Sequence, residues 1–526
     1  MNRASLPQFH HEIGARMARG DWHGAEVLAE NCRAAWPDDD SGWLLGSIAA
    51  LFANRRDRAL ELIEERLTRD PDNVQCRLQK AECLLALGER DRAFDVAESA
   101  ASATETLEAL DAIGTFFASA DNHAAALRVY DKAVSAAPQS ASVLLKRASI
   151  QQFLGRFEDA ARDFQSTLAL SPHDPEALKG LAELRRQSGG NSVTAMLAAL
   201  DAAPPESKEA ATLHFALAKT YEDMEDYSTS WQHLTAANTL ERARLQYDPA
   251  QDRLHVERVI AGFSGPEAVA HDSTGKSPIF IVGLPRTGTT LVERIVGQHS
   301  AVCSAGELGA LSEAIAMVAD RKAPHHAVGW LGYVDTLGAL DGESIAAEYW
   351  ARARSRVDDR PRFSDKAPAN FYYCALIFRA FPKARILHLT RDPLATCYAI
   401  YKTRFSNGFP FAYDLAEIAD FYVGYRKLMA HWHSILPGRI LDVAYEDLVR
   451  SQETATRRIL NYLELPFEAA CLDFHLNPNS TSTASSVQVR QPLYASSVEQ
   501  WRHYSAQLAP VRERLMAAGI SLENVA

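Results

Sequence analysis

Small and apolar residues recur at a nearly constant spacing through the first half of the chain. Alanines stand 34, 34, 33 and 34 residues apart at Ala25, Ala59, Ala93, Ala126 and Ala160. A small residue at such a position lets two helices approach closely, so each unit predicts a pair of helices and a turn. The period places repeats near 6–39, 40–73, 74–106, 107–140 and 141–174, with a further unit at about 207–242.

The pattern changes after residue 245. Short runs rich in Val and Ile occur at 278–283, 384–390 and 438–448, and amphipathic helical patterns lie between them. Strands that alternate with helices predict a parallel sheet with helices on both faces. We therefore expect a helical-repeat domain over 1–244, a linker over 245–276 and an α/β domain over 277–526.

The 34-residue period resembles the tetratricopeptide (TPR) repeat. In the clearest unit, Leu144, Ala148, Phe157, Phe164 and Pro172 occupy the packing positions expected of that repeat. The resemblance implies an N-terminal all-α TPR superhelix. The concave face of such a superhelix holds peptides or protein partners, so we expect protein–protein interaction there.

Composition narrows the class of partner. The net charge of −12 over 526 residues argues against a general binder of nucleic acid or anionic membranes. The seven cysteines form no CxxC pair, so neither a disulfide framework nor a zinc site is indicated, and a reducing compartment is expected. The opening residues lack the apolar core of a signal peptide, and no 18-residue apolar run occurs. We expect a cytoplasmic protein without a membrane span.

A glycine-rich loop follows the first strand of the second half. The stretch GLPRTGTT, residues 283–290, nearly matches the Walker A phosphate loop, but Thr289 stands where the lysine belongs and Arg286 lies inside the loop. A strand, a glycine loop and a helix present backbone N–H groups to an anion. Without the lysine, ATP hydrolysis or kinase chemistry is not favoured.

This loop is similar to the 5′-phosphosulfate loop of sulfotransferases that use PAPS (3′-phosphoadenosine 5′-phosphosulfate), in particular the tyrosylprotein-sulfotransferase-like branch, which in bacteria often follows TPR units. The resemblance covers about residues 277–505 and implies an α/β, P-loop-like sulfotransferase domain. It implies an enzyme that moves a sulfuryl group from PAPS to an acceptor hydroxyl of a protein, a glycan or a small molecule. No metal is expected to be needed.

The resemblance assigns the site residue by residue. Thr287, Gly288, Thr289 and Thr290 would hold the 5′ end of PAPS, together with Arg286. The block VCSAGELGAL (302–311) makes Glu307 the general base. Partial burial is expected to raise the pKa of this carboxyl toward the range of a useful base.

Three further blocks complete the assignment. The block FSDKAPANFYYCALIFRAFPKARILHLTRDP (363–393) makes Lys366, with Arg286, a cation at the leaving oxygen and Arg391 the contact of the 3′-phosphate. The block VAYEDLV assigns Tyr445 to the nucleotide. The segment STASSVQVRQPLYASSVEQW (482–501) assigns Ser485 and Arg490 to closure over the nucleotide.

Two positions depart from the family. Ala399 stands where the family has a serine that donates to the 3′-phosphate, and Leu394 replaces a commonly basic residue. Thr396, Lys402 or Arg404 are candidates to compensate.

Other interpretations stay open at the level of sequence. The chain could be a P-loop NTPase or nucleotide kinase, or a non-catalytic TPR scaffold with a decayed sulfotransferase domain. Glu307 could be an ordinary carboxylate at a helix N-terminus, Lys366 a surface lysine, and Arg391 the partner of Asp392. His299, just after the loop helix, is a competing base.

Three further histidines are expected to be structural. We expect His388 on a strand that faces the sheet layers, and His431 and His433 at the edge of the core.

Overall fold

The computed structural model describes residues 5–188, 190–265, 276–322, 333–405, 408–477, 479–480, 486–493 and 496–522, of which 496 and 497 are described by backbone alone. The chain divides into two compact units, Met1–Ile150 and Gln151–Ala526, which are described one at a time.

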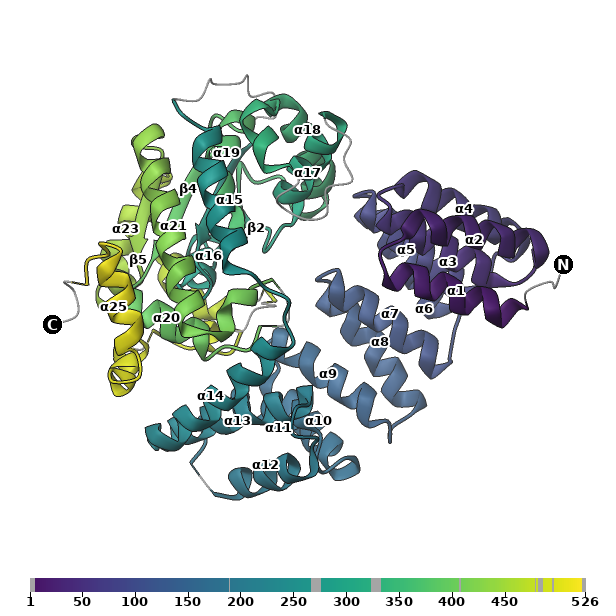
Figure 1. Ribbon diagram of the computed structural model, residues 1–526, viewed down its shortest axis with the longest axis horizontal. Coiled ribbons are helices and arrows are strands. Elements are labelled where there is room, and N and C mark those ends of the chain that lie inside the picture. Colours follow the sequence, from purple (N-terminus) through teal and green to yellow (C-terminus); the bar gives the residue numbers. More distant parts are fainter. Residues whose placement is uncertain are drawn as a thin grey trace. The chain divides into compact units, whose positions relative to one another are not determined.

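The first unit consists of paired helices (Figure 1). The pairs are α1 (Leu6–Ala18) and α2 (Trp22–Ala35), α3 (Asp40–Phe52) and α4 (Arg56–Arg69), α5 (Val74–Ala86) and α6 (Arg90–Ser102), and α7 (Leu107–Ser119) and α8 (His123–Ala136), followed by α9 (Ala141–Phe153), which crosses into the second unit. Each pair coincides with one predicted repeat, so the predicted period is confirmed.

The recurring alanines explain the close pairing. Ala25, Ala59, Ala93 and Ala126 are fully buried, so each lets the second helix of its pair approach its neighbours. Helix starts are fixed by side-chain caps, as where Asn73 Oδ1 accepts the N–H of Cys76 at 2.9 Å.

The second unit begins with helices and continues into a mixed α/β region. Its first helices are α10 (Phe157–Leu170), α11 (Pro175–Leu184), α12 (Gly190–Ala202), α13 (Lys208–Asp223), α14 (Tyr227–Ala243) and α15 (Pro249–Gly262). The later helices are α16 (Thr289–Val296), α17 (Ala310–Lys322), α18 (Gly342–Ala353), α19 (Cys374–Ala380), α20 (Pro393–Tyr401), α21 (Leu415–Ile435), α22 (Tyr445–Arg450), α23 (Gln452–Tyr462), α24 (Ser496–Glu499) and α25 (Ala509–Ala517).

Five parallel strands form one sheet in the order β2-β3-β1-β4-β5. They are β1 (Ser277–Gly283), β2 (Val302–Ser304), β3 (Arg362–Asp365), β4 (Arg385–Thr390) and β5 (Ile440–Ala444). The central strand β1 is buried from Pro278 to Gly283, which accounts for its unbroken apolar run. The predicted parallel sheet is confirmed.

Helices cover both faces of this sheet (Figure 1). Alternate residues of β1 point to opposite faces: Ile279 and Ile281 pack in one apolar cluster, with residues of α16 and α23. Phe280 and Val282 pack in the other cluster, with residues of α19 and α21. The C-terminal fold is therefore the α/β arrangement that the sequence predicted.

The division of the chain differs from the predicted boundary at residue 244. Phe215 of α13 and Leu234 of α14 belong to the same buried cluster as Phe280 of the sheet. The expected linker, 245–276, contains α15, whose Val259 is fully buried in that cluster, while residues 266–275 lie outside the described residues. The last helices of the array thus share a core with the sheet, and the compact units separate at residue 150.

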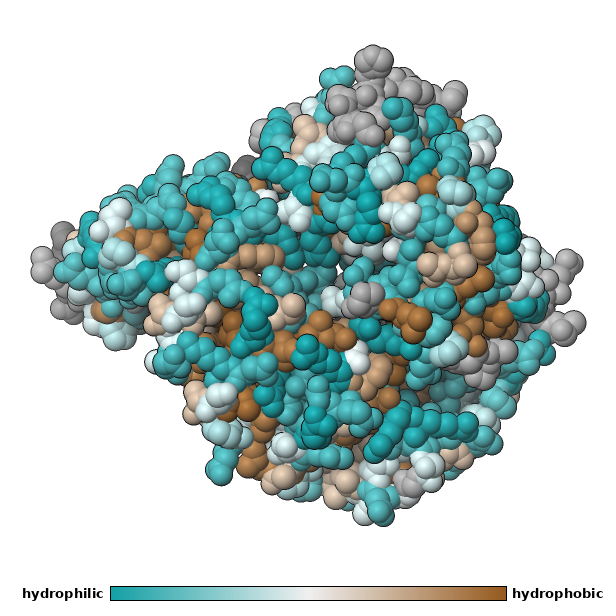
Figure 2. Space-filling view, turned by 180° about the vertical axis from the view of Figure 1, so that it is seen from behind, coloured by the Kyte–Doolittle hydropathy of each residue, from teal (hydrophilic) through white to brown (hydrophobic). Residues whose placement is uncertain are grey.

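Hydrophilic residues dominate the face drawn in Figure 2, and hydrophobic residues form several separate groups on it. Among the residues that the structure describes, no helix is both long enough and apolar enough to cross a bilayer. All seven cysteines are free and buried, in agreement with the expectation that they form no disulfide framework.

We predict that Glu222→Ala destabilises the second unit. Glu222 is 8% exposed, and it accepts hydrogen bonds from the Tyr398 hydroxyl and, at 2.8 Å, from Lys402 Nζ of the α/β region. Removing the carboxylate leaves Lys402 without its anion, so the free energy of unfolding should fall by about 2–4 kcal/mol. Urea unfolding measures the loss.

The matched control is Glu225→Ala, two residues after the end of the same helix. Glu225 pairs with Arg186 at 2.8 Å, but both side chains are 67% exposed, so a change below about 1 kcal/mol is expected. Equal effects of the two substitutions would contradict the buried role of Glu222.

Candidate active site

Every strand of the sheet delivers one predicted site block at its carboxyl end. The glycine loop follows β1, Glu307 lies three residues beyond β2, Lys366 follows β3, Arg391 follows β4 and Tyr445 follows β5. Because all five strands are parallel, these ends lie at one edge of the sheet. In open α/β sheets this is the edge at which ligands bind.

The loop between β1 and α16 has the backbone of an anion cradle. Gly288 caps α16 with φ 100°, and Arg286 takes φ 67°, so the chain passes through left-handed conformations. At Gly283 a Cβ would come within 2.8 Å of the Leu389 carbonyl oxygen, so glycine lets the end of β1 lie against β4. The first N–H groups of α16 have no partner within the helix and carry its positive dipole end.

The threonines of the loop are buried. The Thr287 hydroxyl donates to the Leu284 carbonyl at 2.7 Å, so it fixes the turn. Thr289 and Thr290 open α16 and are 5% and 7% exposed, in the first turn where a bound anion meets the helix.

Arg391 and Tyr445 close the other side of the loop. Arg391 Nη1 donates to the Arg286 carbonyl at 2.9 Å, and its guanidinium carbon lies 4.8 Å from the centre of the Tyr445 ring. The same ring fills the space beside Gly288, where a Cβ would approach Tyr445 Cδ2 to 2.7 Å. Asp392 caps α20 by accepting the Ala395 N–H at 2.7 Å.

A buried lysine lies between two carboxylates. Lys366 is 2% exposed, which excludes the surface-lysine interpretation. Its Nζ contacts Glu307 Oε1 and lies 3.9 Å from Glu293 Oε2 on α16. Burial raises the pKa of Glu293, and the Lys366 charge and the hydrogen bond from Ser304 oppose that rise. Glu293 thus ties the loop helix to the end of β3.

Glu307 is less buried than expected. Its side chain is 53% exposed, so the partial burial expected of this carboxylate is absent. The residue instead presents an open carboxylate beside the Lys366 ammonium, accessible to a molecule that arrives from solvent.

A third acidic group, Asp365, directly precedes the lysine in the chain. Burial raises the pKa of Asp365 to about 8, and hydrogen bonds from the Tyr349 hydroxyl and the Leu308 backbone reduce the rise. The Tyr349 hydroxyl donates to Asp365 Oδ2 at 3.0 Å. The Asp365 carboxyl is therefore largely protonated, and so uncharged, at neutral pH. The positive charge of Lys366 is balanced by Glu293 and Glu307 instead.

Of the two residues assigned to the C-terminal segment, the structure describes only Arg490. Ser485 lies outside the described residues. Arg490 donates to the carbonyl oxygens of Phe153 and Asn479, both at 3.0 Å, so it holds the C-terminal segment against the end of α9. Gln488, two residues earlier, is the residue of this segment that reaches the loop: its Oε1 accepts from Arg286 Nη2 at 2.8 Å.

The candidates to replace the missing serine are engaged elsewhere. The Thr396 hydroxyl donates to the Asp392 carbonyl at 2.9 Å within α20. Lys402 pairs with Glu222, and Arg404 pairs with Glu176 and Glu241, all on repeat helices. The competing base His299 accepts the Ala301 N–H on Nδ1 and therefore donates from Nε2 to the Pro466 carbonyl, which gives it a structural role.

Sequence reasoning missed Glu293, Asp365 and Gln488. Glu293 stands three residues after Thr290, one helical turn away, and that spacing was the available signal. Asp365 directly precedes Lys366, and its sequence context does not distinguish it from other acidic residues at the end of a strand. No sequence signal separates Gln488 from its neighbours.

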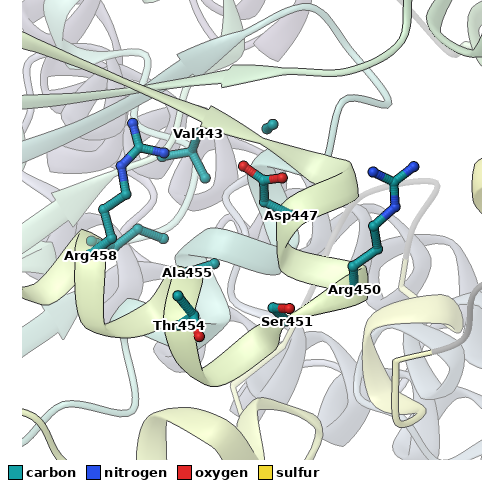
Figure 3. A pocket seen from close by; sticks show the side chains of 9 residues that line it. Val443, Asp447, Arg450, Ser451, Thr454, Ala455 and Arg458 are labelled. Atoms are coloured by element: carbon teal, nitrogen blue, oxygen red, sulfur yellow. The ribbon is translucent and has the colours of Figure 1, made fainter. Parts of the chain in front are cut away.

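A pocket of about 290 Å³ lies beside β5, between α22 and α23. Figure 3 shows the Asp447 carboxylate between the side chains of Arg458 and Arg450. None of the predicted site residues lines it. The five loops at the carboxyl edge, which carry the convergent charges, are the better candidate for chemistry.

The model of the Sulfotransferase family matches residues 278–469. That range contains the glycine loop, Glu307, Lys366, Arg391 and Tyr445, and it ends before Ser485 and Arg490.

Relatives extend the comparison beyond that range. An uncharacterized protein of Aquifex aeolicus (strain VF5) is 31% identical over 403 residues, which is 74% of this chain and 52% of the relative. The protein-tyrosine sulfotransferase of Drosophila melanogaster is 25% identical over 251 residues, or 42% of this chain and 46% of the relative. The chain thus spans about half the length of each of these relatives.

Among solved structures, the sulfotransferase domain from the curacin biosynthetic pathway aligns with 47% of this chain and 99% of its own, with 18% identity and a TM-score of 0.33. The family model thus matches the strands and loops that form the carboxyl edge, and paired helices with a period near 34 residues precede that range in the chain.

Proposed function

We propose that the protein is a sulfotransferase that takes a sulfuryl group from PAPS and transfers it to an acceptor hydroxyl. The observation that carries the proposal is the convergence of the glycine loop, Glu307, Lys366 and Arg391 at one edge of a parallel sheet. A metal-dependent kinase is less well supported, because Thr289 occupies the position of the phosphate-binding lysine.

The residues at this edge fit a donor with an anionic group at each end. Left-handed glycine backbone, the N-terminus of α16 and Arg286 offer one anion site, and Arg391 with the Tyr445 ring offers a second. The link between Arg391 and the Arg286 carbonyl fixes the two sites relative to each other. One adenosine carrying 5′-phosphosulfate and 3′-phosphate matches this pair of sites.

The transfer needs one base and positive charge at the departing oxygen. The acceptor oxygen forms a bond to sulfur as the bond from sulfur to the 5′-phosphate oxygen breaks. The acceptor proton passes to the Glu307 carboxylate, and the electron pair of the broken bond stays on the phosphate of PAP, 3′-phosphoadenosine 5′-phosphate. Arg286 and Lys366 stabilise that charge, and fixed cations of this kind replace the role of magnesium in kinases.

Lys366 acts in this scheme because it is held before the donor arrives. Glu293 and Glu307 keep its ammonium in place while burial excludes water, and little reorganisation is then needed during transfer. Glu307 stays half exposed because the acceptor must reach it.

The acceptor is a hydroxyl of a protein, a glycan or a small molecule. We propose that the helical repeats hold a peptide or protein that is either the acceptor or a partner. The cytoplasmic location stays a prediction.

We predict that the protein binds PAP without magnesium and prefers it to adenosine 5′-phosphate and to ATP. Arg391→Ala should weaken PAP binding by about 10–100-fold, the value of a charged hydrogen bond of about 1.5–3 kcal/mol, and should remove the preference for PAP over adenosine 5′-phosphate. Calorimetric titration measures the dissociation constants of PAP and of adenosine 5′-phosphate.

Arg385→Ala is the control for this titration. Arg385 lies at the opposite end of β4 and pairs with Glu464, so its loss should leave both constants unchanged. A preference for PAP that survives Arg391→Ala would remove Arg391 from the 3′-phosphate site, and magnesium-dependent ATP binding alone would overturn the proposed donor.

We predict that Glu307→Gln lowers turnover by about 10²–10⁴-fold, because the base is lost, and leaves PAP affinity nearly unchanged. Release of PAP from PAPS in the presence of an acceptor is the measurement. Glu313→Gln is the matched control: its side chain is also 53% exposed and also pairs with a basic residue, Arg352, at 3.2 Å. Normal turnover in Glu307→Gln would exclude this residue as the base.

We predict that Lys366→Met lowers turnover by about 10²–10³-fold, because a fixed positive charge at the leaving oxygen is lost. The variant should still fold, since Glu293, whose pKa burial already raises, takes up a proton when the ammonium is absent. Circular dichroism checks the fold. A folded variant with unchanged turnover would show that Lys366 is structural only.

A further inference from the structure

A group of three metal-ligating side chains lies on the face of the sheet that α21 covers. His388 on β4, Asp442 on β5 and His433 in the last turn of α21 each offer one ligand atom, and the three atoms lie within 4.8 Å of one another. Within the described part of the chain, it is the one such group of His, Cys, Asp or Glu. None of the three belongs to the proposed sulfuryl-transfer machinery.

The backbone fixes the three positions independently of any ligand. His388 and Asp442 face each other in the register of β4 and β5. The chain reverses after α21 at Pro437-Gly438, where Gly438 has φ 74°, and this turn returns Asp442 to the end of the helix that carries His433. Three rigid elements therefore deliver the ligands, as a metal site requires.

Both imidazoles point at the same carboxylate oxygen. Asp442 Oδ1 is 2.6 Å from His388 Nδ1 and 3.0 Å from His433 Nε2. Zinc bonds of about 2.0–2.1 Å at tetrahedral angles place ligand atoms about 3.3 Å apart. A small outward movement of the Asp442 side chain, which is 50% exposed, brings its oxygen to that distance from both nitrogens.

His388 Nε2, the ring nitrogen that faces away from Asp442, has a hydrogen-bond partner of the kind that a metal-bound histidine needs. His388 Nε2 contacts the Tyr425 hydroxyl, and that hydroxyl lies 3.5 Å from the Leu389 carbonyl, to which it can donate. Tyr425 can then accept from Nε2–H, which leaves the Nδ1 lone pair directed at the cluster.

The surroundings are open on one side. The His433 side chain is 36% exposed and that of Asp442 50%, so an ion and its waters can enter from solvent. The Arg426 guanidinium on α21 places a positive charge near both histidines, and this charge would repel a bound cation. Because Arg426 is exposed, water screens that repulsion.

We propose that His388, His433 and Asp442 bind a divalent transition metal of the zinc class, with water in the remaining position. Two imidazoles and one carboxylate are a typical donor set for zinc. The ion would fasten the C-terminal turn of α21 to β4 and β5. This site is separate from the carboxyl edge, so the proposal does not depend on the assigned sulfotransferase activity.

The test is zinc binding by the untagged full chain. Competition against a chromogenic zinc indicator should show one equivalent bound with micromolar or tighter affinity, and zinc should raise the thermal midpoint by at least about 2 °C. His433→Gln should weaken binding by at least about 10-fold. His431→Gln, two residues earlier on the same helix, should not.

Cobalt gives a readout that a purely structural role of His433 would not change. Co²⁺ in the wild-type protein should show visible absorption typical of a low-coordinate nitrogen and oxygen site, and His433→Gln should lose it. Asp442→Asn serves as the second variant if His433→Gln is unstable. Absence of stoichiometric binding, or equal binding by wild type and both variants, would overturn the proposal and leave a hydrogen-bonded His–Asp–His group.

Discussion

All five strands of the sheet run in the same direction, and this one constraint assembles the candidate active site. Each strand must end at the same edge, so loops that leave the strands at residues 283, 304, 365, 390 and 444 meet there. The chain connections between them pass over the two faces as helices. Residues far apart in sequence therefore converge at this edge.

Within that edge, the buried ammonium of Lys366 sets the arrangement of charge. A buried cation is costly unless anions accompany it, and Glu293 on α16 and Glu307 beyond β2 supply them. Because α16 begins at the glycine loop, Glu293 links the anion cradle to the cation at the end of β3. The protonated Asp365 avoids a third negative charge in the same space.

The repeats and the sheet could be predicted because their signals are periodic or contiguous. Buried alanines every 34 residues mark close helix pairs, and the apolar run 278–283 marks a central strand. The blocks around Glu307, Lys366 and Arg391 were found because they resemble blocks of the sulfotransferase family, and in the structure each of them follows a strand. Sequence signals of this kind predict single helices, strands and loops. The site forms because the carboxyl ends of parallel strands bring those loops together.

The remaining features depend on tertiary contacts that leave no local trace. Glu293 looks like any charged residue of an amphipathic helix until the sheet buries it. His433 and Asp442 meet only because a turn folds α21 back toward β5. The boundary predicted at residue 244 follows the end of the repeat pattern, while Phe215 and Leu234 ahead of it share a buried cluster with the sheet.

Helices α13 and α14 belong both to the repeat array and to the core that covers the sheet, and this limits how the protein can have evolved. Repeats ahead of residue 150 can be duplicated, lost or recombined as interchangeable modules, because they form a compact unit of their own. The later helices cannot be exchanged in this way, since Glu222, Asn238 and Arg242 contact the α/β region directly. A lineage that changes its repeat number should therefore vary the N-terminal repeats and keep the final ones together with the α/β region.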